Sequence, residues 1–121
     1  MAYKRLQNEI HKIRDNVSPI AFEAFPFEGD QYHWKGHFTG PVNSLYEGGT
    51  FHLDIQFPKQ YPFAAPIITF TTAIYHLNIS KEGRICLDEL NHSWSPVITI
   101  KKISELLHSI LEQPLGVENA L

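Results

Sequence analysis

Residues 75–96, YHLNISKEGRICLDELNHSWSP, separate a strand-rich part of the sequence from a final helical part. This stretch shows neither a helical nor an alternating hydrophobic period, because polar residues, Gly83 and Pro96 interrupt each short apolar run. A connection of about twenty residues without regular structure is uncommon in a compact domain and is usually functional or disordered. The aliphatic and aromatic residues along it can anchor it to a core, so the sequence predicts an ordered, functional loop.

Four short segments before this loop have the features of β-strands. The clearest is residues 51–57, in which apolar and polar residues alternate. Residues 20–27, 32–38 and 67–70 are the other three, and turn-forming residues separate them. Such short spacings between strands are typical of an antiparallel meander.

Helical patterns precede and follow the strands. In the first, apolar residues recur every three or four positions with polar residues such as Glu9 between them, which predicts a surface helix with one buried stripe. The stripe consists of Tyr3, Leu6, Ile10, Ile13 and Val17. Residues 100–111 show the same spacing, with Thr99 as the expected N-cap and Pro114 beyond the end. The order of helix, four strands, long loop and helix predicts an α+β fold, in which the helices pack on one face of a four-stranded antiparallel sheet.

Length and composition limit the classes of protein that fit. A chain of 121 residues with 43% hydrophobic and 19% charged residues has the composition of a soluble globular protein, and we expect a single domain over residues 1–121. The net charge of −3 gives no basic surface for general nucleic-acid binding. No apolar run approaches the roughly 18 residues of a membrane span, and the polar N-terminus lacks the core of a signal peptide. We therefore expect a protein that binds neither nucleic acid nor membrane, with a monomer as the default state.

The protein has one cysteine, Cys86. It cannot form an internal disulfide, and secreted proteins rarely leave a thiol unpaired, so we expect a reducing compartment: the cytoplasm, with the nucleus as an alternative. A lone cysteine between aliphatic residues is often an inert core residue. Here Gly83 and Asp88 bracket a very short apolar run, which favours a thiol near the surface.

A cysteine protease is one alternative for this thiol. Such an enzyme needs a histidine base and a third group that orients the base. His76 and His92 are the candidate bases by sequence proximity. Asn78 or Asp88 could be the third member, but no protease signature surrounds Cys86.

A structural zinc site is a second alternative, and it normally takes four closely spaced Cys or His ligands. The seven histidines are scattered along the chain. His33 and His37 belong to a predicted strand, where a solvated face is the simpler interpretation. The sequence therefore predicts no metal site.

The motifs of the long loop resemble the active-site region of ubiquitin-conjugating enzymes. They are His76-Leu77-Asn78, where the family has His-Pro-Asn, then GRICLD at residues 83–88 and WSP at residues 94–96. Earlier motifs agree, namely YHW at 32–34, YEGGTF at 46–51 and YPF at 61–63. The similarity extends from residue 4 to about residue 114 and is greatest to the small, core-domain-only members that work with many ligases. It implies the family's fold: an N-terminal helix, a four-stranded antiparallel meander, the active-site loop and further helices.

The resemblance implies an acyl-transfer reaction at Cys86. This thiol would accept the C-terminal carbonyl of ubiquitin from the thioester of an activating enzyme and pass it to a lysine of a substrate protein or to a ligase cysteine. Asn78 would stabilise the oxyanion, hold the loop, or do both. His76 would shape the loop, Asp88 would lie at the rim of the site, and Glu118 would be the acid beside the attacking lysine. No cofactor is expected on this protein, because the activating enzyme uses the ATP.

The resemblance also implies a surface for ubiquitin ligases of the RING or HECT type. Its hot spot would be Phe63, an exposed aromatic residue flanked by prolines, although Phe63 could instead fill the core. The expected surface consists of Lys4, Arg5, Pro62, Phe63, Ser95, Pro96 and Val97.

Two departures from the family pattern carry expectations of their own. Leu77 replaces the proline of the tripeptide, so the backbone angle is not locked, and we expect reduced but present transfer. The sequence stops at Leu121, where relatives continue into two more helices, so we expect a C-terminally short form without them. The helix at residues 100–111 would then expose an apolar patch or be less stable.

Two alternative functions share this fold. One is a non-catalytic scaffold that binds ubiquitin, although such members usually lack the cysteine that Cys86 supplies here. The other is conjugation of a different ubiquitin-like modifier, which the sequence leaves open. The basic residues Lys4 and Arg5 and the loop with Phe63 favour ubiquitin.

Overall fold

The strands form one antiparallel sheet whose order is the order of the chain. A computed structural model describes residues 2–15 and 21–113. Its elements are α1 (Ala2–Asp15), β1 (Glu23–Phe27), β2 (Asp30–Thr39), β3 (Thr50–Gln56), β4 (Ile67–Phe70), α2 (Asp88–Asn91) and α3 (Ile100–Glu112). The sheet order β1-β2-β3-β4, with every neighbouring pair antiparallel, confirms the predicted meander.

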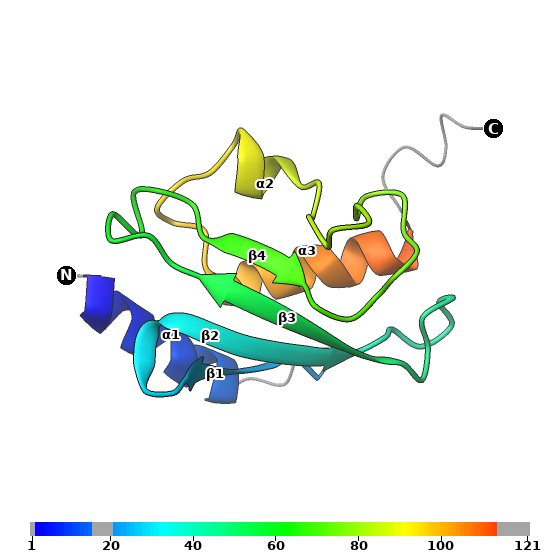
Figure 1. Ribbon diagram of the computed structural model, residues 1–121, viewed down its shortest axis with the longest axis horizontal. Coiled ribbons are helices and arrows are strands. Elements are labelled where there is room, and N and C mark those ends of the chain that lie inside the picture. The colour runs from blue at the N-terminus through cyan, green and yellow to red at the C-terminus, as the bar shows by residue number, and fades with distance from the viewer. Residues whose placement is uncertain (1, 16–20, 114–121) are drawn as a thin grey trace.

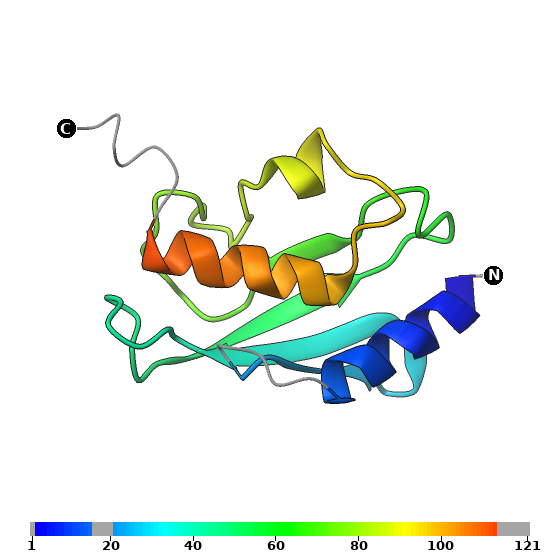
Figure 2. The same ribbon diagram turned by 180° about the vertical axis from the view of Figure 1, so that it is seen from behind.

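Both long helices cover the same face of this sheet. Figure 1 shows the sheet in front of α1 and α3, and Figure 2, from behind, shows the two helices in front of the sheet. The helix α1 packs against β1 and β2 and also contacts α3, so the two helices form one layer on the sheet. The α+β architecture predicted from the order of elements is therefore confirmed. No described helix has both the length and the apolar character needed to cross a membrane.

The core lies between the helices and the inner face of the sheet. Alternation directs one side of each strand inward, so Trp34 and Phe38 of β2 are fully buried while their neighbours face outward. From α1, Leu6, Ile10 and Ile13 are buried as the stripe predicts. Tyr3 is 48% exposed, which corrects its assignment to the stripe, because it lies in the first turn of the helix. Val17 lies outside the described residues.

The first strand is shorter than predicted and the second is longer. β1 begins at Glu23 because Ala21 has a φ of 51°, which an extended strand does not allow. The turn between β1 and β2 has positive φ at both Glu28 and Gly29, the conformation of a tight two-residue hairpin. Pairing therefore starts immediately, with Phe27 opposite Asp30.

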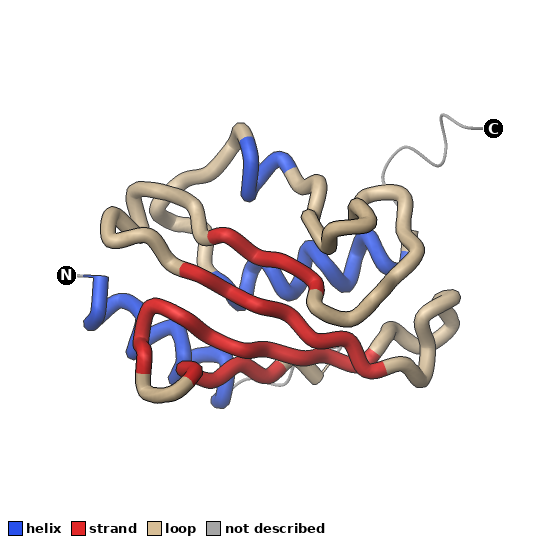
Figure 3. Tube along the Cα trace, in the orientation of Figure 1, coloured by secondary structure: helices blue, strands red, loops and turns tan. Residues whose placement is uncertain are grey.

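The long loop extends beyond β4, the last strand of the sheet, and contains one element that the sequence did not predict (Figure 3). This element is the single-turn helix α2, which is too short to show a hydrophobic period.

The final helix α3 begins as expected at the Thr99 cap, whose Oγ1 accepts a hydrogen bond of 3.1 Å from the Lys102 N–H. The expected apolar patch is not seen on this helix, since its large apolar side chains are buried or half-buried.

Candidate active site

Cys86 lies on an extended run whose side chains alternate between solvent and core. Ile85 and Leu87 are 5% and 2% exposed, whereas Arg84 and Cys86 face outward. The two buried aliphatic residues anchor the run, and the thiol between them is exposed. The structure therefore confirms a thiol at the surface and excludes an inert core cysteine.

Backbone hydrogen bonds hold the segment around the cysteine, which we call the Cys86 flap (residues 78–86). The Cys86 N–H donates to the Asn78 carbonyl oxygen at 2.7 Å, and the Ser80 N–H donates to the Arg84 carbonyl oxygen at 2.9 Å. The flap is tied to the sheet because the Phe70 N–H of β4 donates to the Gly83 carbonyl oxygen at 2.9 Å. These bonds fix the backbone on both sides of the thiol.

Gly83 makes this attachment possible. Its φ is +88°, a conformation that favours glycine, and a Cβ there would lie 2.2 Å from the Phe70 carbonyl oxygen. Any larger residue would push the flap away from β4.

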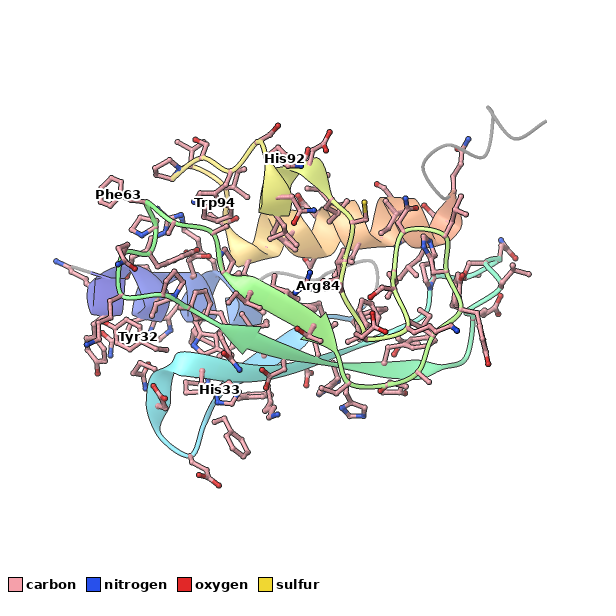
Figure 4. The ribbon with its side chains drawn as sticks, turned by 45° about the horizontal axis from the view of Figure 1, so that its top comes forward. Tyr32, His33, Phe63, Arg84, His92 and Trp94 are labelled. Carbon is pink, nitrogen blue, oxygen red and sulfur yellow. The ribbon has the colours of Figure 1, made fainter. Side chains whose placement is uncertain are left out.

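His76 connects the loop to the end of α3. Its Nδ1 accepts a hydrogen bond of 2.8 Å from the Asn78 N–H, so the proton lies on Nε2, which donates to the Ile110 carbonyl oxygen at 2.6 Å. Both ring nitrogens are therefore engaged in shaping the loop. His92 lies exposed beside α2 (Figure 4), and no hydrogen bond joins either histidine to Cys86 in the described part of the chain. The geometry thus gives no support to a protease triad.

Asn78 and Cys86 line the same cavity, which has a volume of about 640 Å³. The cavity lies between β4, the Cys86 flap and α2. Asp88, two residues after Cys86, is exposed at the first position of α2. The structure thus brings together the candidate nucleophile and the candidate amide, while Glu118 lies outside the described residues.

Leu77 occupies the second position of a turn closed by the bond from the Ile79 N–H to the His76 carbonyl oxygen, at 3.2 Å. Proline is favoured at the second position of common β-turns because its ring fixes φ near the value that they require. The leucine side chain is 69% exposed and anchors nothing in the core.

The residues expected to bind a ligase gather at the opposite end of the loop region. Phe63 and Val97 are 70% and 83% exposed, which excludes Phe63 as a core residue. Their loops are joined because the Trp94 indole N–H donates to the Pro62 carbonyl oxygen at 2.8 Å, and Figure 4 shows Phe63 and Trp94 side by side at this end. Lys4 is exposed on α1, and Ser95 and Pro96 are half-buried.

Arg5 is not a free surface cation, because it belongs to a buried polar cluster. Its Nε donates to Glu9 Oε2 at 2.7 Å and its Nη2 donates to the Ile98 carbonyl oxygen at 3.0 Å. Glu9 is 2% exposed and also accepts from the Tyr61 hydroxyl and, at 2.7 Å, from the Ile100 N–H. We call these five residues the Glu9 network.

In the Glu9 network, the Glu9 carboxylate only accepts hydrogen bonds. Burial raises the pKa of the Tyr61 phenol and the adjacent Glu9 raises it further, so the hydroxyl stays protonated and donates. Partial burial lowers the pKa of Arg5, but the hydrogen bonds and charge interactions with Glu9 and Tyr61 together outweigh it, and the pKa is raised overall. The sequence prediction placed Glu9 on the polar face of the helix and missed this role. The spacing of four residues between Arg5 and Glu9 was the available signal.

Histidines on the outer face of the sheet pair with carboxylates. His33 Nε2 lies 2.5 Å from Asp54 Oδ1, and His37 Nε2 lies 3.3 Å from Glu23 Oε2. No cluster of three or more metal-binding side chains occurs within residues 2–15 and 21–113.

Comparisons with known proteins agree with this geometry. Residues 5–121 match the family model of ubiquitin-conjugating enzymes. A solved structure, the E2 domain of a ubiquitin conjugating enzyme from Toxoplasma gondii, superposes with a TM-score of 0.87 at 37% sequence identity. The match covers 97% of this chain and 79% of that one. The chain belongs to the ubiquitin-conjugating enzyme family.

Proposed function

We propose that Cys86 accepts the C-terminal carbonyl of ubiquitin as a thioester and passes it to a substrate lysine or to a ligase cysteine. The observation that carries this proposal is the exposed thiol, held on a flap that backbone hydrogen bonds fix to the sheet. A bulky donor and a bulky acceptor can both reach such a sulfur. A nucleophile in a deep cavity would exclude them.

In the first step the Cys86 thiolate attacks the carbonyl of the thioester on the activating enzyme, whose cysteine leaves as a thiolate. One thioester replaces another, so no cofactor is needed here and the ATP is used upstream. In the second step an amine attacks the new thioester, a tetrahedral oxyanion forms and collapses, and the Cys86 thiolate leaves. The amine proton passes to solvent or to an acidic residue at the rim.

Asn78 is the proposed donor to the oxyanion. An amide donor fixed beside developing negative charge can lower the barrier by about 3 kcal/mol. Asn78 is also part of the flap, since its main chain bonds both His76 and Cys86. It therefore has a positioning role as well. Asp88 and Glu118 are proposed as acids near the attacking lysine.

The surface around Phe63 and Val97 is the proposed contact for RING or HECT ligases. Exposed apolar side chains on a rigid support make good hot spots, because little conformational entropy is lost on binding. The proposed surface also includes Lys4, Pro62, Ser95 and Pro96. Arg5 would support it through its hydrogen bonds to Glu9 and to the Ile98 carbonyl oxygen. Phe63→Ala should leave charging of Cys86 unchanged and reduce ligase-stimulated discharge at least tenfold, measured by single-turnover gels.

Charging with activating enzyme, ATP and ubiquitin tests the proposal directly. The unmodified protein should form an adduct that a thiol reductant cleaves, Cys86→Ala should form none, and Cys86→Ser should form an ester that resists reductant. An adduct only with another modifier would identify that modifier as the substrate. No adduct with any modifier, while ubiquitin still binds non-covalently, would contradict the proposal in favour of a scaffold.

A further inference from the structure

The loop between β2 and β3 reaches the start of the long loop through the side chain of Tyr46. The Tyr46 hydroxyl donates to the Tyr75 carbonyl oxygen at 2.6 Å. The Tyr46 ring also lies beside the His76 ring, with 5.7 Å between the ring centroids. Figures 1 and 2 show this loop, the start of the long loop and the end of α3 at the same end of the molecule. Tyr46 therefore holds the backbone just before the turn that contains Asn78.

The loop that carries Tyr46 is itself held by main-chain hydrogen bonds and close packing. The Gly40 N–H donates to the Gly49 carbonyl oxygen at 2.9 Å, and the Gly49 N–H donates to the Tyr46 carbonyl oxygen at 3.1 Å. Gly40 packs so closely that an added Cβ would lie 1.8 Å from the Tyr46 carbonyl oxygen. The Tyr46 ring packs edge-on against Phe51 of β3, with 6.0 Å between the centroids. These contacts fix the position of the hydroxyl relative to the sheet.

A continuous series of contacts joins Tyr46 to the proposed nucleophile. Burial raises the pKa of the Tyr46 phenol, so the hydroxyl stays protonated and donates to Tyr75. In the next residue, His76 Nδ1 accepts from the Asn78 N–H at 2.8 Å. The Asn78 carbonyl oxygen accepts in turn from the Cys86 N–H at 2.7 Å. A shift of the Tyr75 backbone would therefore move both the proposed oxyanion donor and the backbone of the nucleophile.

Leu77 makes the support of this turn important. A proline at the second position would fix φ, whereas Leu77 leaves it unlocked, and the leucine side chain is 69% exposed. The conformation of the turn therefore depends on its neighbours. On its N-terminal side, the Tyr46 hydroxyl holds the Tyr75 main chain, and the Ile110 carbonyl oxygen accepts from His76 Nε2 at 2.6 Å.

We propose that Tyr46 is a positioning residue for the reaction at Cys86: its hydroxyl fixes the turn of residues 76–79, and with it Asn78, where no proline locks the turn. The inference rests on the proposed function, since Cys86 must carry the modifier. Tyr46 acts through Tyr75 and the turn. The hydroxyl and a proline would restrict the same stretch of backbone, so loss of the hydroxyl should matter less once a proline is present. The two substitutions should therefore be non-additive.

The test is a double-mutant cycle in the full chain charged at Cys86. Tyr46→Phe keeps the ring and removes the hydroxyl. It should lower the maximal rate of thioester discharge to free lysine about threefold to tenfold, the range for one neutral hydrogen bond, at an unchanged half-saturating lysine concentration. In combination with Leu77→Pro, it should slow discharge by less than about twofold relative to Leu77→Pro alone.

Tyr61→Phe is the matched control. It also removes a tyrosine hydroxyl, whose partner is Glu9 under the Phe63 surface, and it should lower the stability at least as much as Tyr46→Phe. Discharge to free lysine should be unchanged in Tyr61→Phe, with or without Leu77→Pro. Thermal unfolding of all variants verifies folding and separates a general loss of stability from an effect on the turn.

Amide hydrogen exchange locates the effect within the uncharged protein. Tyr46→Phe should raise the exchange rates of the Asn78 and Cys86 amides about threefold to tenfold, because both donate hydrogen bonds beside the turn. The Phe57 amide, which donates to the Tyr32 carbonyl oxygen within the sheet, should keep its rate. A general loss of stability would speed the exchange of all three amides together.

Three results would overturn the inference. They are equal slowing of discharge by Tyr46→Phe with and without Leu77→Pro, equal slowing by Tyr46→Phe and Tyr61→Phe, and equally faster exchange of all three amides. If the unmodified protein forms no thioester, the proposed function fails and the inference fails with it. A normal thioester whose discharge does not respond to Tyr46→Phe overturns the inference alone.

Discussion

The Glu9 network and the Cys86 flap both present exposed functional residues, but they are held by different forces. Under the Phe63 surface, a buried carboxylate joins α1, the loop at Tyr61 and the start of α3 through side-chain hydrogen bonds. Around Cys86, main-chain hydrogen bonds and one glycine conformation fix the loop. One region thus depends on a few particular side chains, and the other depends chiefly on backbone geometry.

This difference determines where each region is sensitive to substitution. Loss of the partners of a buried charged group is strongly destabilising, because water cannot replace them. Removal of the charged group is also destabilising, because its buried partners are then left unpaired. A main-chain hydrogen bond survives most side-chain changes, so the flap should tolerate most substitutions. The exceptions should be positions that need a positive φ and positions whose side chain bonds the loop backbone. The following substitutions test this contrast in order of expected effect.

Glu9→Ala should have the largest effect. It leaves the Tyr61 hydroxyl and the Ile100 N–H without their buried acceptor, so the free energy of unfolding should fall by about 2–4 kcal/mol. Urea unfolding measures this loss. Asn8→Ala, at an exposed neighbour on the same helix, is the control and should change stability by less than about 0.5 kcal/mol. Equal effects of the two substitutions would show that the network does not stabilise this end of the protein.

Gly83→Ala should disrupt the backbone attachment of the flap to β4. It adds both strain at positive φ and a clash with the Phe70 carbonyl oxygen, for an expected loss of about 1–3 kcal/mol. Gly48→Ala is a matched control, because Gly48 has a φ of +85° and a Cβ added there would meet nothing within 4 Å. The difference between the two variants in thermal unfolding isolates the clash. If both lose the same stability, close contact between flap and β4 is not important.

His76→Ala should have a smaller effect, because it removes two hydrogen bonds and leaves the others of the flap intact. We expect a loss of about 1–2 kcal/mol and slower discharge of the Cys86 thioester. His92→Ala, at an exposed position, should leave both unchanged. Equal stability of the two variants would mean that His76 does not hold the loop, and it would contradict the role assigned to this residue.

Leu77→Pro should have the smallest effect and the opposite sign. Proline restricts the unfolded chain and suits the second position of the turn, so stability should rise by about 0.4–1 kcal/mol and discharge should become faster. Leu77→Ala is the control for loss of the side chain and should do neither. A less stable Leu77→Pro variant would mean that the turn at His76 does not have the conformation that proline requires.

Much of the fold was predictable because local sequence patterns determine most of its helices and strands. The alternation in β3 and the spacing in α3 each reflect one element that buries one face, and Thr99 caps α3 as its type and position predict. The start of β1 and the helix α2 were not predictable. The first depends on the positive φ of Ala21, and the second is shorter than one hydrophobic period.

The candidate site divides in the same way. The motif around Cys86 and the exposure of its thiol followed from a short apolar run between polar residues. The Glu9 network did not follow, because a glutamate among other charged and polar residues of an amphipathic helix has the pattern of a solvated face. Its burial results from Tyr61 and Ile100, which lie 52 and 91 residues away in the chain.

By itself, the sequence determined the order of the elements, the family resemblance and the identity of the candidate nucleophile. These depend on neighbours within a few residues, where period, turn chemistry and motif act directly. Only the tertiary structure decided that Glu9 is buried, that His76 binds α3, and that Arg84 and Cys86 border one cavity with β4. These features arise from contacts between distant segments, and solvent exposure is set only when such segments pack together.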